Sequence, residues 1–228
     1  MPAGKKQGLR EAGRTSALGT ATIIVNEMWW ARGYSKGERV ENTVTAVAAV
    51  IRRAKASDRE AFGELYRLTV KPVYRYLSAR LSGQADAEEL TQEVFLAALA
   101  GLPNLRAEDE VGLLAWLLQI ARYKLADRLR GRYRRPSTPL EEVAEVQDDS
   151  NLPGDLALAS EERAELRAAL ERLTPEQREV VIAKYVLGYD NERTARLVGK
   201  NTNAVNQLHH RALASLHRLL TSTERAGQ

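Results

Sequence analysis

Apolar residues recur every three or four positions over most of the chain, which is the period of an α-helix buried along one face. The first such stripe follows Asp58, a good N-cap residue, and contains Pro72, which is expected to kink or split the helix. A second stripe begins after Asp86, which is expected to cap it, and Gly101 and Pro103 end it. The alternation typical of β-strands is missing from the sequence, so we predict an all-α protein.

The helical pattern continues beyond a polar loop at 104–110, and a third helix is predicted over 112–132. Three further helices each follow a residue that caps helices well: 175–186 after Thr174, 191–198 after Asp190 and 202–220 after Asn201. Turns at Gly188 and Gly199 join them, and the last two helices have the spacing of a helix-turn-helix. A plain three-helix bundle with a polar face stays open as the alternative.

Charge divides this pattern into segments. Residues 136–160 contain six acidic residues, three prolines and no Lys or Arg, which is typical of an extended linker. Residues 50–135 contain sixteen Lys and Arg against eleven Asp and Glu. Such a basic block suggests a polyanionic partner, and an ordinary solvated surface stays open as the alternative. We expect two helical domains joined by a flexible acidic linker: N-terminal tail 1–43, first domain 44–135, linker 136–160, second domain 161–222 and C-terminal tail 223–228.

Composition removes several classes of function. The chain has no cysteine, which excludes a disulfide scaffold, a thiolate metal site and a cysteine nucleophile. Its three histidines lie within nine residues near the C-terminus, so a catalytic centre or metal site built on histidine is not expected. No apolar run approaches the roughly 20 residues that span a bilayer. We expect a soluble cytoplasmic chain, not an enzyme, with no cofactor and no membrane insertion.

Polar side chains gather on one face of the last predicted helix. Its apolar positions, among them Val205 and Ala212, are expected to face the core. Amide side chains can bond adenine edges in the major groove, and arginine can bind phosphate or guanine. The candidate DNA-binding residues are those left outside: Thr202, Asn203, Asn206, Gln207, His210 and Arg211.

Two earlier helices carry opposite charges. The helix 112–132 ends in a dense group of basic residues beside Tyr123, more than a helix C-terminus alone favours. An aromatic ring among arginines can stack on an unpaired base. The preceding helix has an acidic face around Gln92, which is either a solvated face or a docking face for a basic protein helix. The charged residues are Asp86, Glu89 and Glu93 in the acidic group and Arg122, Lys124, Arg128, Arg130 and Arg132 in the basic group.

Four runs of sequence, in order, resemble bacterial RNA polymerase sigma factors. The run DAEELTQEVFL from Asp86 resembles the core-binding segment, region 2.2, and LAWLLQIAR from Leu114 is similar to the segment that reads the promoter −10 element. The run LTPEQREV from Leu173 resembles the opening of region 4, and HRAL from His210 the end of its recognition helix. With no middle domain, the chain is identified as a member of the extracytoplasmic-function (ECF, group 4) type of the sigma-70 family.

The resemblance implies core RNA polymerase, at its β′ clamp helices and β flap, and promoter DNA as partners, and an anti-sigma protein stays open as a third. It implies polymerase contacts for Asp86, Glu89, Gln92, Glu93 and Phe95. It implies −10 contacts for Asn104, Arg106, Trp116, Arg122, Tyr123, Lys124, Arg128, Arg130 and Arg132. It implies −35 contacts for Asn201, Thr202, Asn203, Asn206, Gln207, His210 and Arg211. The acidic linker is then expected to thread toward the RNA exit channel.

The sequence departs from the family pattern at several positions. Many relatives have a cation at Asn206 and a serine at Gln207, so the −35 sequence preference is not predicted. Thr91 replaces an aliphatic residue, and Tyr123 stands where asparagine is frequent. Two alternatives stay open: a two-domain helix-turn-helix regulator, which does not need the acidic face, and a sigma mimic that sequesters an anti-sigma protein, which does not need the basic one.

Overall fold

The computed structural model describes residues 40–134 and 160–226, and all the regular secondary structure in these ranges is helical. The N-terminal bundle contains α2 (Val40–Lys55), α3 (Arg59–Ser78), α4 (Gln84–Gly101), the 3₁₀ turn η1 (Leu102–Asn104) and α5 (Glu110–Arg134). The C-terminal bundle contains α6 (Ser160–Glu171), α7 (Pro175–Val181), the π turn η2 (Ile182–Val186), α8 (Asn191–Val198) and α9 (Thr202–Ala226). The all-α prediction is confirmed, while the predicted tails and linker lie almost wholly outside the described residues.

The N-terminal bundle forms where the apolar stripes predicted it, with differences at the helix ends. Asp58 caps α3, and its carboxylate accepts hydrogen bonds from the backbone of Glu60 and Ala61. The helix α3 continues through Pro72 without splitting. Pro72 is partly exposed and Leu68, whose carbonyl loses its helical partner, is 47% exposed, so the missing hydrogen bond lies away from the core. Asp86 does not cap α4: the helix begins after Gly83 and places Asp86 in its first turn, where its charge still suits the helix dipole.

The C-terminal bundle has the predicted helix-turn-helix. Asp190 caps α8, whose bounds are those predicted, and α8 ends at Gly199 in the left-handed conformation that glycine adopts readily. Thr174 and Gln177 form a capping box at the start of α7. The helix predicted over 175–186 is α-helical only to Val181 and then widens into the π turn η2, which the periodicity did not predict.

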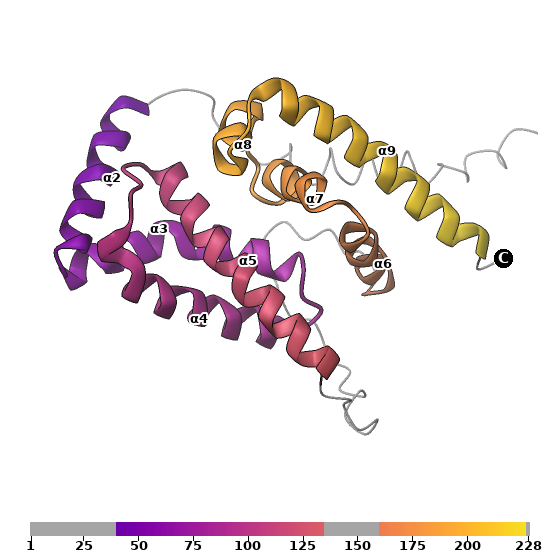
Figure 1. Ribbon diagram of the computed structural model, residues 1–228, viewed down its shortest axis with the longest axis horizontal. Coiled ribbons are helices and arrows are strands. Elements are labelled where there is room, and N and C mark those ends of the chain that lie inside the picture. Colours follow the sequence, from indigo (N-terminus) through magenta and orange to yellow (C-terminus); the bar gives the residue numbers. More distant parts are fainter. Residues whose placement is uncertain (1–39, 135–159, 227–228) are drawn as a thin grey trace, which may run out of the picture.

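The two bundles pack directly against each other (Figure 1). Helix α5 contacts α8, and α3 contacts the π turn η2. The apolar core of the N-terminal bundle extends into the C-terminal bundle, where Ile182, Ala183 and Leu197 are buried as part of it. The long helix α9 runs along the outer side of the C-terminal bundle, so the outward face of its first turns lies away from this contact.

Candidate functional site

The acidic and basic groups predicted on α4 and α5 lie against each other. The guanidinium of Arg128 forms ion pairs with Asp86 at 3.0 Å, with Glu89 at 2.6 Å and with Glu93 at 3.3 Å. Lys124 pairs with Glu93 at 2.9 Å. Burial lowers the pKa of Arg128, but the three carboxylates outweigh it and raise the pKa overall, so the positive charge is fixed. This charged seam holds the acidic residues of α4 in place.

Beside the seam, α4 presents a mixed polar and apolar face to solvent. Gln92 is exposed, and Leu96 and Leu99, four and seven residues further on, share its side of the helix with Leu96 at 70% exposure. Phe95 was predicted on this surface but is buried at 6%, where its ring meets Tyr66 edge to face. These two leucines were not singled out from the sequence. Their position outside the apolar stripe that contains Leu90 was the signal that could have indicated exposed apolar residues.

The loop between α4 and α5 presents its predicted residues outward. Asn104 and Arg106 are exposed on either side of Leu105, which is buried and whose carbonyl accepts a hydrogen bond of 2.7 Å from Lys55. This anchor fixes the loop against α2. Trp116 is half-buried, and its indole lies so close over Gly101 that a β-carbon there would come within 3.1 Å of the ring. Trp116 is therefore a boundary residue that supports the loop.

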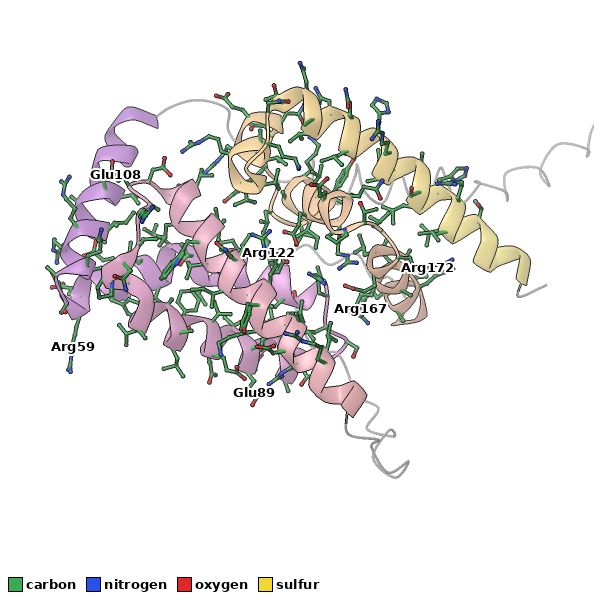
Figure 2. The ribbon with its side chains drawn as sticks, viewed as in Figure 1. Arg59, Glu89, Glu108, Arg122, Arg167 and Arg172 are labelled. Carbon is green, nitrogen blue, oxygen red and sulfur yellow. The ribbon has the colours of Figure 1, made fainter. Side chains whose placement is uncertain are left out.

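The other predicted −10 residues on α5 divide between two sides of the helix. Tyr123 is 69% exposed, and Arg130 is exposed beside Asp127, with which it pairs. Arg132 lies in α5, but its side chain is outside the described residues. Arg122 points the other way, toward the C-terminal bundle, and Figure 2 shows it on the opposite side of α5 from Glu89.

The predicted −35 residues lie together at the start of α9. Asn201 precedes the helix, and its side chain accepts a hydrogen bond of 2.8 Å from the backbone of Ala204. Asn206 accepts a hydrogen bond of 2.7 Å from Asn191 of α8, which ties the two helices of the helix-turn-helix together. The face as a whole is exposed, as predicted: Thr202, Asn203, Asn206, Gln207, His210 and Arg211.

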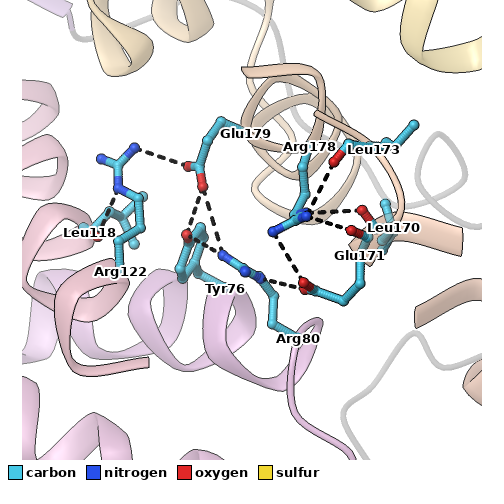
Figure 3. Close-up of polar contacts among 9 residues, drawn as sticks. All are labelled: Tyr76, Arg80, Leu118, Arg122, Leu170, Glu171, Leu173, Arg178 and Glu179. Carbon is cyan, nitrogen blue, oxygen red and sulfur yellow. Dashed lines mark hydrogen bonds and ion pairs between the residues drawn. The ribbon is translucent and has the colours of Figure 1, made fainter. Parts of the chain in front are cut away.

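Ion pairs join the two bundles on both sides of their contact. Glu179 of α7 accepts a hydrogen bond of 2.7 Å from Tyr76 and pairs with Arg122 at 3.2 Å (Figure 3). Arg80 pairs with Glu171 at 2.9 Å and reaches Glu179 at 3.9 Å. These residues link α3, the turn that follows it and α5 to α6 and α7.

At the other end of the contact, α8 supplies the cations and the start of α5 supplies the acids. Arg193 pairs with Glu110 at 3.3 Å, and Arg196 pairs with Asp109. Burial raises the pKa of Asp109, but hydrogen bonds from the Gly112 backbone and from Arg196 outweigh it, so the pKa is lowered overall. Arg193 and Arg196 were not predicted as functional residues, although both lie on the first helix of the predicted helix-turn-helix.

Among residues 40–134 and 160–226, no group of three or more acidic or histidine side chains is placed to hold a metal ion. None of the helices described is both long and apolar enough to cross a membrane.

Comparison with known proteins identifies the family. The Sigma-70 region 2 model matches residues 65–135, and the Sigma-70 region 4 model matches residues 163–216. The chain is 36% identical over 176 residues to the ECF RNA polymerase sigma factor BldN of Streptomyces coelicolor. The aligned region is 77% of this chain and 66% of that protein. It is 34% identical over 186 residues to the ECF sigma factor SigD of Mycobacterium tuberculosis, and the aligned region is 79% of this chain and 84% of that protein.

A third curated relative supports the same family, and a solved structure shares the fold. The chain is 32% identical over 187 residues to the ECF sigma factor ShbA of Streptomyces griseus and covers 97% of it, with 78% of this chain aligned. The fold is similar to that of CnrH, solved in complex with the cytosolic domain of CnrY, with a TM-score of 0.51 and 21% identity over 78% of this chain and 98% of that chain. The chain therefore belongs to the ECF RNA polymerase sigma factors of the sigma-70 family.

Proposed function

We propose that this sigma factor binds core RNA polymerase through the outward face of α4 and binds promoter DNA through α5 and the start of α9. The observation that carries the proposal is the exposed stripe of Gln92, Leu96 and Leu99 beside carboxylates that Arg128 holds in place. A central apolar contact with charged groups around it is the usual composition of a specific protein interface. The implied partner is a basic helical element, such as the β′ clamp helices.

Within this surface, Arg128 is assigned a different role from that implied by the resemblance. Its side chain is 18% exposed, and its guanidinium is paired with three carboxylates. Such a group has little capacity left for DNA phosphates. We assign Arg128 as a positioning residue for the polymerase-binding face, and Phe95 as a core residue that supports the same helix from below.

The DNA-binding part of the proposal uses the exposed residues of three segments. Tyr123 offers an aromatic face to an unpaired base, and Arg106 stands in the adjacent loop. The first turns of α9 would enter the major groove at the −35 element, where Asn203 and Gln207 can bond base edges and Arg211 a phosphate or guanine. The hydrogen bond from Asn191 to Asn206 supports a fixed orientation of α9 relative to α8.

The test is transcription in vitro with purified core polymerase, together with co-elution of the chain and the polymerase. The variant Glu89→Arg with Leu96→Arg is expected to abolish both. Neither residue is buried, so the helix should still fold. The control is Glu162→Arg, which repeats the Glu89→Arg change at an exposed position of α6. Equal binding by the variant and the wild type would reject the α4 face as the docking surface.

A further inference from the structure

Three polar side chains form a relay of hydrogen bonds from the π turn through α8 to α9. The Lys184 ammonium donates to Oδ1 of Asn191 at 2.5 Å, and Nδ2 of Asn191 donates to Oδ1 of Asn206 at 2.7 Å. Lys184 and Asn191 are half-buried, whereas Asn206 is exposed. The relay therefore runs from inside the C-terminal bundle to the outward face of α9.

The cation at the inner end fixes the direction of both bonds in the relay. An ammonium has three donors and no acceptor, so the group of Asn191 that meets Lys184 has to be the amide oxygen. The NH₂ group of Asn191 then points to Asn206, whose own oxygen accepts from it. Neither amide can turn over without placing a donor against a donor. Lys184 thus determines the orientation of an exposed side chain that it does not contact.

The NH₂ group of Asn206 is left for a partner from outside the protein. The oxygen of this side chain is turned toward α8, and within the described ranges its Nδ2 donates to no other protein group. Asn203 and His210, three residues before and four residues after, share its side of α9 and are exposed as well. A fixed hydrogen-bond donor therefore lies in the middle of the face proposed for the −35 element.

Base pairs differ in what they present to such a donor in the major groove. Guanine presents N7 and O6 and thymine presents O4, which are acceptors, whereas the amino groups of adenine and cytosine are donors. An asparagine that reads adenine uses its oxygen and its NH₂ group together on one base. Asn206 meets a base with its NH₂ group alone, so an amino group at the same place would leave two donors facing each other.

We propose that Asn206 determines specificity at one position of the −35 element, where it selects a keto base, guanine or thymine, over an amino base, adenine or cytosine. Lys184 and Asn191 are positioning residues that impose this choice. The inference rests on the proposed −35 contact of α9 and specifies what one residue of that contact reads. It makes a chemical choice on DNA depend on a lysine of the π turn.

The experiment measures base preference in the complete complex. Holoenzyme assembled from the full chain and core polymerase selects promoters from a genomic library, and the upstream element of one selected promoter is then randomised for a second selection. Asn206→Ala identifies the position concerned, because the preference should disappear there and nowhere else. For the wild type, we expect the keto base on the contacted strand to be enriched about tenfold over the amino base.

Asn191→Asp tests the direction of the relay. A carboxylate has only acceptors, so one oxygen can accept from Lys184 and the other from the NH₂ group of Asn206. Asn206 then turns over and offers its oxygen to the base, and the preference at the identified position should reverse from keto to amino. Because every keto base pairs with an amino base, the reversal is informative whichever strand is contacted. An unchanged preference would overturn the inference.

Lys184→Met tests the inner end of the relay, because it removes the cation and keeps an unbranched side chain at this half-buried position. Both amides are then free to turn over, so the preference at the identified position should be largely lost while the other positions keep theirs. A purely structural role of Lys184 would weaken binding to all sequences alike. An intact preference in this variant would overturn the assignment of Lys184 as a positioning residue.

Asn203→Asp is the matched control, because it adds the same charge to the same face outside the relay. It should weaken binding to all sequences through repulsion from the phosphates and leave the preference at the Asn206 position unreversed. A reversal there too would assign the effect to charge and overturn the inference. If the wild-type holoenzyme enriches no upstream sequence, the proposed −35 function fails and this inference fails with it. If it enriches one and Asn206→Ala changes no position, this inference alone fails.

Discussion

The hydroxyl of Tyr76 on α3 donates a hydrogen bond of 2.7 Å to the carboxylate of Glu179 on α7, across 103 positions of sequence. Tyr76 is fully buried, and burial together with the charge of Glu179 raises the pKa of Tyr76 above its ordinary value. The hydroxyl therefore stays protonated and remains a donor. A charge of the C-terminal bundle is thus satisfied from inside the core of the N-terminal bundle.

Tyr76→Phe tests this link with little change in core volume. The ring still fills its site, but Glu179 loses its neutral donor, and loss of a hydrogen bond to a charged group costs about 1–3 kcal/mol. We expect a drop of that size in the free energy of unfolding, measured with urea. Tyr66→Phe is the control, because Tyr66 is exposed; a drop as large there would argue against a specific role for the Tyr76 hydroxyl.

Arg128→Ala tests the role of the charged seam. Removal of the guanidinium leaves Asp86, Glu89 and Glu93 without their shared cation, so the carboxylates repel one another and lose their fixed positions. We expect affinity for core polymerase to fall roughly tenfold, equivalent to about 1.4 kcal/mol, with no change in the salt dependence of DNA binding. Arg130→Ala, an exposed cation of the same helix, is the control. A reduced salt slope for Arg128→Ala would instead place this residue on DNA.

Thr194→Val tests a buried hydroxyl of α8. Thr194 is fully buried, and within the described part of the chain its hydroxyl has no hydrogen-bond partner. Replacement by an apolar group of the same shape removes the cost of burying that hydroxyl, so we expect the free energy of unfolding to rise by up to about 1 kcal/mol. Thr194→Ser, which keeps the hydroxyl and loses a methyl group, should lower it by a similar amount. If Thr194→Ser were more stable than Thr194→Val, the hydroxyl would have a hydrogen-bond partner in solution.

His209 makes the stability of the C-terminal bundle depend on pH. Burial, then the positive charges of Lys184 and His210, lower the pKa of His209 from its ordinary value of 6.5, and its ring bonds the Tyr185 hydroxyl at 2.8 Å. Because the unfolded chain binds this proton more readily, stability is greatest above pH 6.5 and falls as pH drops below it.

His209→Gln keeps a polar partner for Tyr185 and removes the titrating ring. The urea midpoint of the wild type should decrease between pH 7.5 and pH 5.5, and the variant should lose much of that decrease. His217→Gln, which removes one histidine elsewhere on α9, is the control for a change in histidine number. An identical pH profile for the wild type and His209→Gln would assign the dependence to other groups.

Capping preferences and helical periodicity predicted the features of this fold that depend on neighbouring residues. The caps at Asp58, Thr174 and Asp190 and the outward face of α9 followed from residue type and helical spacing. Asp86 failed as a cap because Gly83, three residues earlier, already supplies the extended conformation from which α4 starts. Cap preferences rank residues but do not fix the helix start when two candidates are close together.

The contacts that decide the candidate sites are distant in sequence and could not be predicted in this way. Arg122 and Glu179 are 57 residues apart, and no spacing rule pairs them. From sequence, a basic residue on an exposed helix indicates an anionic partner without telling whether that partner is DNA or a carboxylate of the same chain. The same ambiguity applied to Arg128, whose partners on α4 had been assigned to a separate surface.

Four consecutive residues at the junction of α7 and the π turn face three different apolar clusters. Val180 packs with Ala195 and Val205, Val181 packs with the cluster of α6 and α9, and Ile182 and Ala183 join the core of the N-terminal bundle. Successive positions of a helix point about 100° apart, so four neighbouring side chains can reach different sides of it. A change in side-chain volume anywhere in this tetrapeptide is transmitted to every packed layer of the molecule. We therefore expect this short stretch to tolerate the narrowest range of substitutions among close relatives.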